Sequence, residues 1–175
     1  TLVETESGPK QPTGVESVRS LLAGELAAMG FTIRLQKVSG APDLLIAERG
    51  KEEGEGPIIL SGHMDTVFPE GKASTCPFFI DEEGYAHGPG VLDMKGGLVV
   101  SLYAVKALSA LSLVTPPIKF VFVTDEETLH MHSNAKAVLR REITGAKAFL
   151  NFEPCAENGQ VVLSRYGGGP ESIHV

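Results

Sequence analysis

Apolar positions along the chain fall into runs and spacings that predict alternating strands and helices. Short apolar or alternating runs predict strands at residues 31–35, 44–47, 57–60, 118–124, 146–152 and 161–163. Apolar residues at helical spacing predict helices at residues 15–29, 98 to about 113, and 133–141. Strands that alternate with helices indicate an α/β fold: a mostly parallel sheet with helices on both of its faces.

Local signals set the ends of these elements. Thr13 with Glu16 three residues later matches a capping box at the start of the first helix, and Gly30 is a natural C-terminal stop. Two prolines, at positions 116 and 117, end the second helix. Residues 68–85 show no regular pattern, and we expect an irregular segment there with a turn at residues 81–84.

Composition narrows the class of protein. The chain has 175 residues, enough for one domain with a core, and its 42% hydrophobic and 21% charged residues are ordinary for a globular protein. A net charge of −7 argues against a nucleic-acid or membrane-surface role. Cys76 and Cys155 lack the spacing of a metal site or a disulfide framework, so we expect buried or idle thiols.

Acidic residues follow three of the predicted strands. His63 and Asp65 come after residues 57–60, three acids at 125–127 follow residues 118–124, and Glu153 follows residues 146–152. The carboxyl ends of parallel strands meet at one edge of the sheet, where ligands bind in α/β folds. One imidazole and several carboxylates at such an edge indicate a metal site.

Each of these signals has a plainer alternative. His63 and Asp65 point to the same side of an extended chain and suit a metal ligand with its orienting carboxylate, or else form a turn with a packed His and a solvated Asp. Asp93 lies in a glycine-rich segment, either as a constrained site residue or as the N-cap of the following helix. Glu153 alone reads as a solvated residue at a strand end.

The acidic run at residues 125–127 is more informative because the strand before it is strongly apolar. Three carboxylates there are costly to bring together unless a cation or a proton offsets their charge. In a two-metal hydrolase one such carboxylate binds metal while its neighbour moves the proton. The alternative is a solvated acidic turn.

Four stretches taken together are more specific than any of them alone. They are SGHMDTV at residues 61–67, GPGVLDMKGG at 88–97, TDEE at 124–127 and NFEP at 151–154. In this order they resemble the co-catalytic zinc peptidase/amidohydrolase family, which includes bacterial glutamate carboxypeptidase, aminoacylase and succinyl-diaminopimelate desuccinylase. The resemblance covers nearly the whole chain and implies the family's three-layer catalytic domain with a mixed, mostly parallel sheet.

The resemblance also implies a role for each matching residue. The metal ligands would be His63 and Glu153 on one zinc, Glu127 on the other, and Asp93 bridging both, with a cis peptide between Asp93 and Met94. The catalytic residues would be Asp65, which orients His63, and Glu126, the general base and acid. The cofactor would be two Zn²⁺ ions, with Co²⁺ or Mn²⁺ as alternatives.

By the same resemblance, the protein would hydrolyse a C–N amide bond, with a small peptide or an N-acyl amino acid as substrate. A Glu at position 153 resembles the carboxypeptidase and deacylase branches, not the aminopeptidases. The reaction expected first is release of an amino acid such as glutamate. The alternatives are an N-acyl amino acid deacylase or desuccinylase, and a non-catalytic metal-binding module. The family also implies a homodimer formed through a lid domain. As the net charge indicates, we expect no nucleic-acid or membrane partner.

Two features depart from the family pattern. The family's remaining zinc ligand is a His that follows the lid domain, and His174 is not expected to replace it. The family usually has small residues after its Glu-Glu pair, whereas residues 128–133 read TLHMHS. We expect a reshaped loop in which His130 and His132 are solvated; the alternative is that one of them contacts substrate or metal.

The two ends suggest a segment of a longer protein. The chain starts at Thr1 without an initiator Met, and residues 172–175 read as the start of a new strand. We expect the catalytic domain at residues 1–166, and a linker with the start of the lid at residues 167–175. A cytoplasmic location is favoured, with no leader sequence to judge it by.

Overall fold

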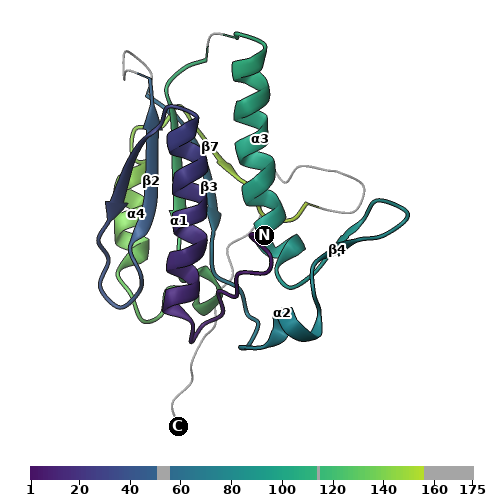
Figure 1. Cartoon of the computed structure of the whole chain (residues 1–175). Coiled ribbons are helices and arrows are strands. Elements are labelled where there is room, and N and C mark those ends of the chain that lie inside the picture. Colours follow the sequence, from purple (N-terminus) through teal and green to yellow (C-terminus); the bar gives the residue numbers. More distant parts are fainter. Residues whose placement is uncertain (51–55, 114, 156–175) are drawn as a thin grey trace.

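The computed structural model describes residues 1–50, 56–113 and 115–155 (Figure 1). Its main sheet has five strands in the order β1-β2-β6-β3-β7. They are β1 (Thr32–Gln36), β2 (Leu44–Arg49), β3 (Ile58–His63), β6 (Ile118–Val123) and β7 (Ala148–Asn151). The predicted strand at 161–163 and the proposed boundary between residues 166 and 167 lie outside the described residues.

The sheet is mixed and mostly parallel, as the sequence predicts. β3 lies between β6 and β7 and is parallel to both, with His63 opposite Val123 and Ser61 opposite Asn151. β2 is antiparallel to both β1 and β6, so it is the one strand of the five that runs against the others. The carboxyl ends of β3, β6 and β7 therefore lie at one edge.

Helices cover both faces and make three layers (Figure 1). α1 (Pro12–Ala28) and α3 (Gly96–Ala110) share a core with one face of the sheet, while α4 (Ala135–Ile143) packs on the other. The alternation along β6 explains this division, because Phe120 and Phe122 join the α1/α3 core and Val121 and Val123 join the α4 side. None of the helices among the described residues has the length and apolar character needed to span a bilayer.

Some local predictions are wrong. α1 begins at Pro12 with Gln11 as its N-cap and no side-chain cap, so Thr13 lies inside the first turn and forms no capping box. The reason is Pro12, whose fixed φ and missing N–H suit the first helical position. For Cys76 and Cys155, expected to be buried or idle, burial is excluded because both are free and exposed.

The segment predicted to be irregular carries short regular elements. It contains the helix α2 (Lys72–Thr75) and the strand β4 (Phe79–Ile80), which pairs with β5 (Ala86–His87) as an antiparallel hairpin. The predicted turn at residues 81–84 is confirmed as the link between the two strands, since the backbone N–H of Gly84 donates to the carbonyl of Asp81.

Candidate metal centre

His63 is the last residue of β3, and its imidazole is 1% exposed. Its Nδ1 lies 3.0 Å from the carbonyl oxygen of Asp65. A carbonyl only accepts hydrogen bonds, so this contact fixes the proton on Nδ1 and leaves Nε2 facing the site. Nε2 lies 2.9 Å from Asp93 Oδ1 and 3.6 Å from Glu153 Oε1.

Asp65 joins the end of β3 to the turn that follows β6. Its carboxylate is buried and lies 3.5 Å from His63 Nδ1. It also accepts the backbone N–H groups of Glu126, at 3.2 Å, and Glu127, at 2.9 Å. One side chain therefore holds the imidazole and the acidic pair in a fixed relation.

Asp93 lies in an irregular turn, Val91–Lys95, that leads into α3. The peptide bond from Asp93 to Met94 is cis, which confirms that expectation. The N-cap of α3 is Lys95 and no side chain caps the helix, so the alternative that Asp93 is merely an N-cap is wrong. Met94 is fully buried beneath the site, and its Sδ accepts the backbone N–H of His63 at 3.1 Å.

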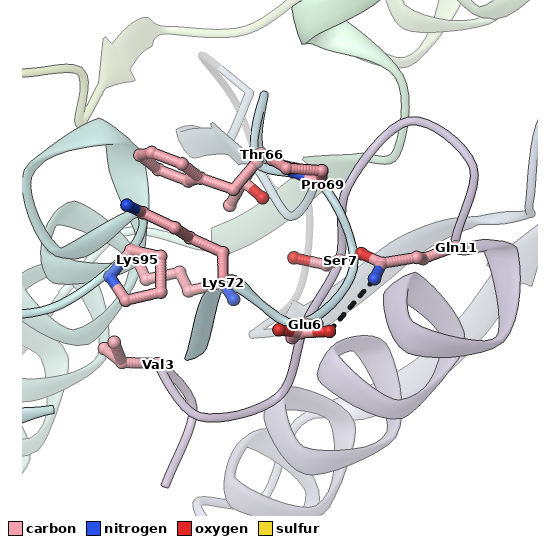
Figure 2. Close-up of a pocket in the computed structure, with 10 residues that line it drawn as sticks. Val3, Glu6, Ser7, Gln11, Thr66, Pro69, Lys72 and Lys95 are labelled. Atoms are coloured by element: carbon pink, nitrogen blue, oxygen red, sulfur yellow. Dashed lines mark hydrogen bonds between the residues drawn. The ribbon is translucent and has the colours of Figure 1, made fainter. Parts of the chain in front are cut away.

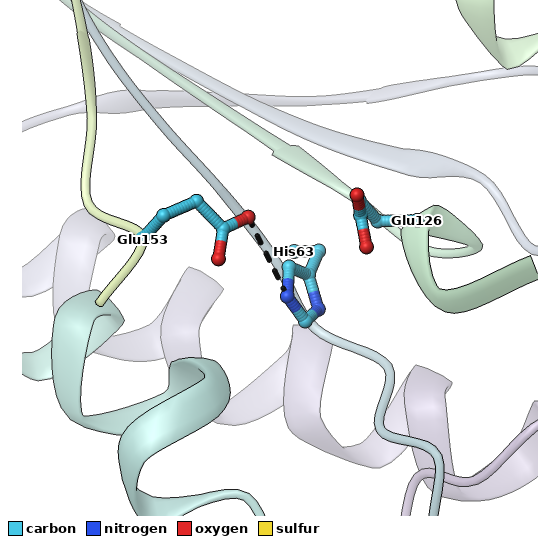
Figure 3. Close-up of side chains that lie close together, drawn as sticks. All are labelled: His63, Glu126 and Glu153. Atoms are coloured by element: carbon cyan, nitrogen blue, oxygen red, sulfur yellow. Dashed lines mark ion pairs between the residues drawn. The ribbon is translucent and has the colours of Figure 1, made fainter. Parts of the chain in front are cut away.

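The remaining acids converge on the same imidazole. Glu126 and Glu127 begin the turn Glu126–Thr128 after β6, and Glu153 lies two residues beyond the end of β7. Ligand atoms of His63, Glu126 and Glu153 lie within 4.8 Å of one another, as do those of His63, Asp93 and Glu127. Figure 3 shows Glu126 and Glu153 on opposite sides of the His63 ring.

All six predicted site residues thus come together at the carboxyl ends of three parallel strands. Imidazole nitrogen and carboxylate oxygen are the donors that zinc binds in proteins, and two overlapping groups of them offer places for a pair of ions. This donor set fits a divalent metal. Which residues act as ligands and which as base stays a prediction.

Burial and neighbouring charges together shift the pKa values of His63, Glu126 and Glu127. Burial lowers the pKa of His63, but the carboxylates of Asp65 and Glu153 outweigh it and raise that pKa to about 11. Burial raises the pKa of Glu127 to about 7. The charge of His63 acts against this rise, while the charges of Asp93, Asp65 and Glu126 add to it. Burial likewise raises the pKa of Glu126. The site therefore favours positive charge at its centre.

The expectation of two solvated histidines holds for His132 only. His132 is exposed, but the side chain of His130 is 9% exposed and its Nδ1 lies 2.7 Å from Asp125 Oδ1. Sequence reasoning missed this contact because it depends on a left-handed turn at Leu129 and His130, which neither residue type predicts.

Sequence reasoning also missed the role of residues 1–11, which form an N-terminal arm against the site loops. Lys95 is buried, donates from Nζ to the carbonyl of Thr5 at 2.7 Å, and burial lowers its pKa to about 8. Thr66 N–H donates to the carbonyl of Ser7 at 2.9 Å. The arm thereby ties together the loops that carry Asp65 and Asp93.

A small cavity lies between the arm and these loops (Figure 2). The centre of a water molecule can move within about 10 Å³ of this cavity, so the cavity has room for one water. The Ser7 hydroxyl is fully buried there without a hydrogen-bond partner among the described residues. The carboxylate of Glu6 accepts the backbone N–H groups of Gly71 and Ala73 at the start of α2.

Comparisons of this sequence with a family profile and with curated proteins agree with one another. The profile of Peptidase family M20/M25/M40 matches residues 59–166. Carboxypeptidase G2 of Pseudomonas sp. (strain RS-16) is 33% identical over 158 residues, which are 87% of this chain and 37% of that protein. An acetylornithine deacetylase of Yersinia pseudotuberculosis serotype O:1b (strain IP 31758) is 38% identical over 120 residues, which are 65% of this chain and 31% of that protein.

Solved structures agree on the fold. An M20 family metallo-carboxypeptidase from Sulfolobus solfataricus superposes with a TM-score of 0.70 at 16% identity, covering 86% of this chain and 35% of that one. The di-peptidase Dug1p from Saccharomyces cerevisiae gives 0.70 at 18% identity, covering 86% of this chain and 36% of that one. The chain spans about a third of the length of the curated relatives that it matches.

Proposed function

Because the chain belongs to Peptidase family M20/M25/M40, we propose that the protein carrying it is a two-zinc hydrolase of C–N amide bonds. The observation that carries the proposal is the convergence of His63, Asp93 and three glutamates at one sheet edge. The proposed substrates are small peptides or N-acyl amino acids, with release of an amino acid such as glutamate. The likeness to carboxypeptidase G2 over 87% of the chain supports this choice.

The chain's own residues account for the steps of an amide hydrolysis. When bound, a pair of divalent ions would polarise the scissile carbonyl and lower the pKa of water, so that water can lose a proton and attack at neutral pH. His63 and Asp93 would hold the ions, together with Glu127 and Glu153. Glu126 would take the proton from the attacking water and deliver it to the leaving amine. Asp65 would keep both His63 and the Glu126–Glu127 backbone in place.

Glu126→Gln is the variant that tests this assignment. Glutamine keeps the shape of the side chain but cannot accept a proton, so we expect kcat to fall at least ~100-fold while zinc content stays at the wild-type level. The measurement is hydrolysis of N-acyl amino acids and dipeptides by the intact protein, with zinc content by atomic absorption. Glu82→Gln, an exposed acid in the hairpin turn, is the matched control.

Two results would overturn the proposal. Zinc titration that finds one weak site or none would favour a non-catalytic metal-binding module. Full activity in Glu126→Gln would remove the proposed base. A loss of zinc in Glu126→Gln would instead make Glu126 a ligand, which its place beside His63 and Glu153 permits (Figure 3).

A second candidate function is N-acyl amino acid deacylation or desuccinylation, which uses the same bond chemistry. The similarity to an acetylornithine deacetylase over 65% of the chain favours it. The two are separated by comparing kcat/KM for a peptide that ends in glutamate with kcat/KM for N-acetyl and N-succinyl amino acids. Preference for the acetyl or succinyl compounds would replace the carboxypeptidase assignment.

A further inference from the structure

The segment after the Glu126–Glu127 pair folds back onto Asp125. His130 Nδ1 lies 2.7 Å from Asp125 Oδ1, and Ser133 Oγ donates to Asp125 Oδ2 at 2.5 Å. The backbone N–H of His130 donates to the carbonyl of Asp125 at 3.1 Å. Both carboxylate oxygens and the carbonyl of Asp125 are therefore engaged by its own loop.

The loop makes this return through two left-handed residues. Leu129 has φ of 55° and His130 has φ of 53°, a conformation that costs a residue with a Cβ roughly 1–2 kcal/mol. Such a turn persists only where its surroundings hold it. Leu129 is 42% exposed, whereas the side chain of His130 is 9% exposed and bonded to Asp125.

The strained turn is continuous with the residues that face His63. The carbonyl of Glu126 accepts the N–H of Leu129 at 2.6 Å, while the N–H groups of Glu126 and Glu127 donate to Asp65. The backbone of the acidic pair is thus fixed from both sides, by Asp65 and by the returning loop. A change at His130 would release one side only.

We propose that His130 is a positioning residue that, through Asp125, fixes the backbone from which Glu126 and Glu127 reach the metal centre. The role differs from those considered for it above, a solvated loop residue or a contact to substrate or metal. Nδ1 is committed to Asp125, and His130 belongs to neither group of possible ligands among the described residues. The proposal rests on the hydrolase function proposed above.

Three single variants of the intact protein test it. His130→Ala removes the donor to Asp125, His130→Asn keeps an N–H donor near the position of Nδ1, and His132→Ala changes the exposed neighbour as a control. We expect His130→Ala to weaken zinc binding about 10–100-fold, as loss of a supporting hydrogen bond does in metal sites. We expect kcat to fall more than KM rises, and His130→Asn to recover most of both losses.

Hydrogen exchange of the zinc-free protein gives a readout that does not depend on activity. The N–H groups of Glu126 and Glu127 should exchange faster in His130→Ala, and at the wild-type rate in His130→Asn and His132→Ala. Melting temperatures of the same samples separate this local opening from global unfolding.

Wild-type zinc affinity and exchange rates in His130→Ala would overturn the proposal, as would an equal loss in His130→Asn and His130→Ala. Failure of the hydrolase function has a different signature, because the wild-type protein itself would then lack tight zinc sites or amide hydrolysis. In that case the exchange rates alone decide whether His130 holds the turn.

Discussion

Asp65 shows at the scale of one residue how the candidate metal centre is held together. Its two carboxylate oxygens accept N–H groups from Glu126 and Glu127, and the same carboxylate lies 3.5 Å from His63 Nδ1. In Asp65→Asn one oxygen becomes an NH₂ group, which faces a backbone N–H and leaves it without an acceptor. We therefore expect zinc affinity to fall about 10–100-fold, measured by isothermal titration.

Asp43→Asn is the control for Asp65→Asn. The Asp43 carboxylate pairs with Lys37, whose side chain is 87% exposed, and such pairs contribute little to stability or to a distant site. Equal zinc affinity in wild type and Asp65→Asn would show that Asp65 does not support the ligands.

The convergence of these side chains was predictable at this scale, but the contacts that support them were not. His63, Asp65 and the three glutamates were found because they lie at or just after the ends of strands that apolar runs reveal. Asp93 follows no strand, and only the family resemblance pointed to it. His130 was misjudged because its burial depends on the backbone conformation of Leu129 and His130. Lys95 was missed because its partner, the carbonyl of Thr5, lies 90 residues away in the sequence.

Close approach of two elements fixes the position of Glu153. Gly97 lies in the first turn of α3, and a Cβ added there would lie 2.0 Å from the carbonyl oxygen of Phe152, the residue before Glu153. The backbone of β7 and α3 must separate to admit a methyl group, so we expect Gly97→Ala to destabilise the protein by about 1–3 kcal/mol. Urea unfolding gives the free energy, and zinc titration should show weaker binding.

Gly24→Ala makes the same chemical change without the contact. Gly24 lies within α1, and a Cβ added there meets nothing within 4 Å. Alanine is the better helix former by about 1 kcal/mol, so this control should be neutral or slightly stabilising. A Gly97→Ala variant as stable as Gly24→Ala would contradict the close packing of α3 on the end of β7.

A charged cluster joins α4 to the sheet. Glu142 on α4 accepts hydrogen bonds from Lys119 of β6 and Arg34 of β1, each at 2.8 Å, and its side chain is 8% exposed. Burial acts to raise the pKa of Glu142, but the hydrogen bonds and charges of Arg34 and Lys119 outweigh it and lower that pKa below 4.5. Glu142→Gln should cost about 2 kcal/mol of unfolding free energy at pH 7, because Lys119 and Arg34 lose their buried partner.

The pH dependence of that cost follows from the direction of the shift. A carboxyl whose folded pKa is lowered adds stability above its unfolded pKa and loses it as the pH falls through the folded pKa. The difference between wild type and Glu142→Gln should therefore shrink as the pH falls below 4.5, the ordinary value for this group. Glu25→Gln, at an exposed pair with Lys106, should leave the unfolding free energy nearly unchanged. A difference in unfolding free energy between wild type and Glu142→Gln that stays constant with pH would contradict this account.

Elements were predicted well where their apolar periodicity is strong. The fully buried strand β6 and the helices α1 and α3 were found within a few residues of their ends. The short elements α2, β4 and β5 were missed because they span only two to four residues each, too few to show a periodic apolar pattern. The start of α1 was misplaced because Thr13 suggested a cap where Pro12 already begins the helix.

At the scale of the whole molecule, the topology accounts for the charge at the site. β3, β6 and β7 run in parallel, so acids far apart in the sequence meet at one edge of the sheet. His63 is the one group among them that carries positive charge, and its raised pKa reflects how strongly these carboxylates favour a cation. Folding without a metal therefore brings like charges together, and a bound divalent ion should stabilise the whole fold.

This linkage predicts a rise in melting temperature when zinc is returned to chelator-treated protein. Zinc at 100 times its dissociation constant stabilises the folded state by about 2.7 kcal/mol. For a chain of this size, that corresponds to a rise of roughly 5–10 °C in calorimetry or thermal fluorescence. His63→Ala removes the nitrogen shared by both groups of possible ligands, so zinc should barely move its melting temperature. His132→Ala, exposed and outside both groups, should keep the wild-type shift, and an equal shift in His63→Ala would place zinc elsewhere on the protein.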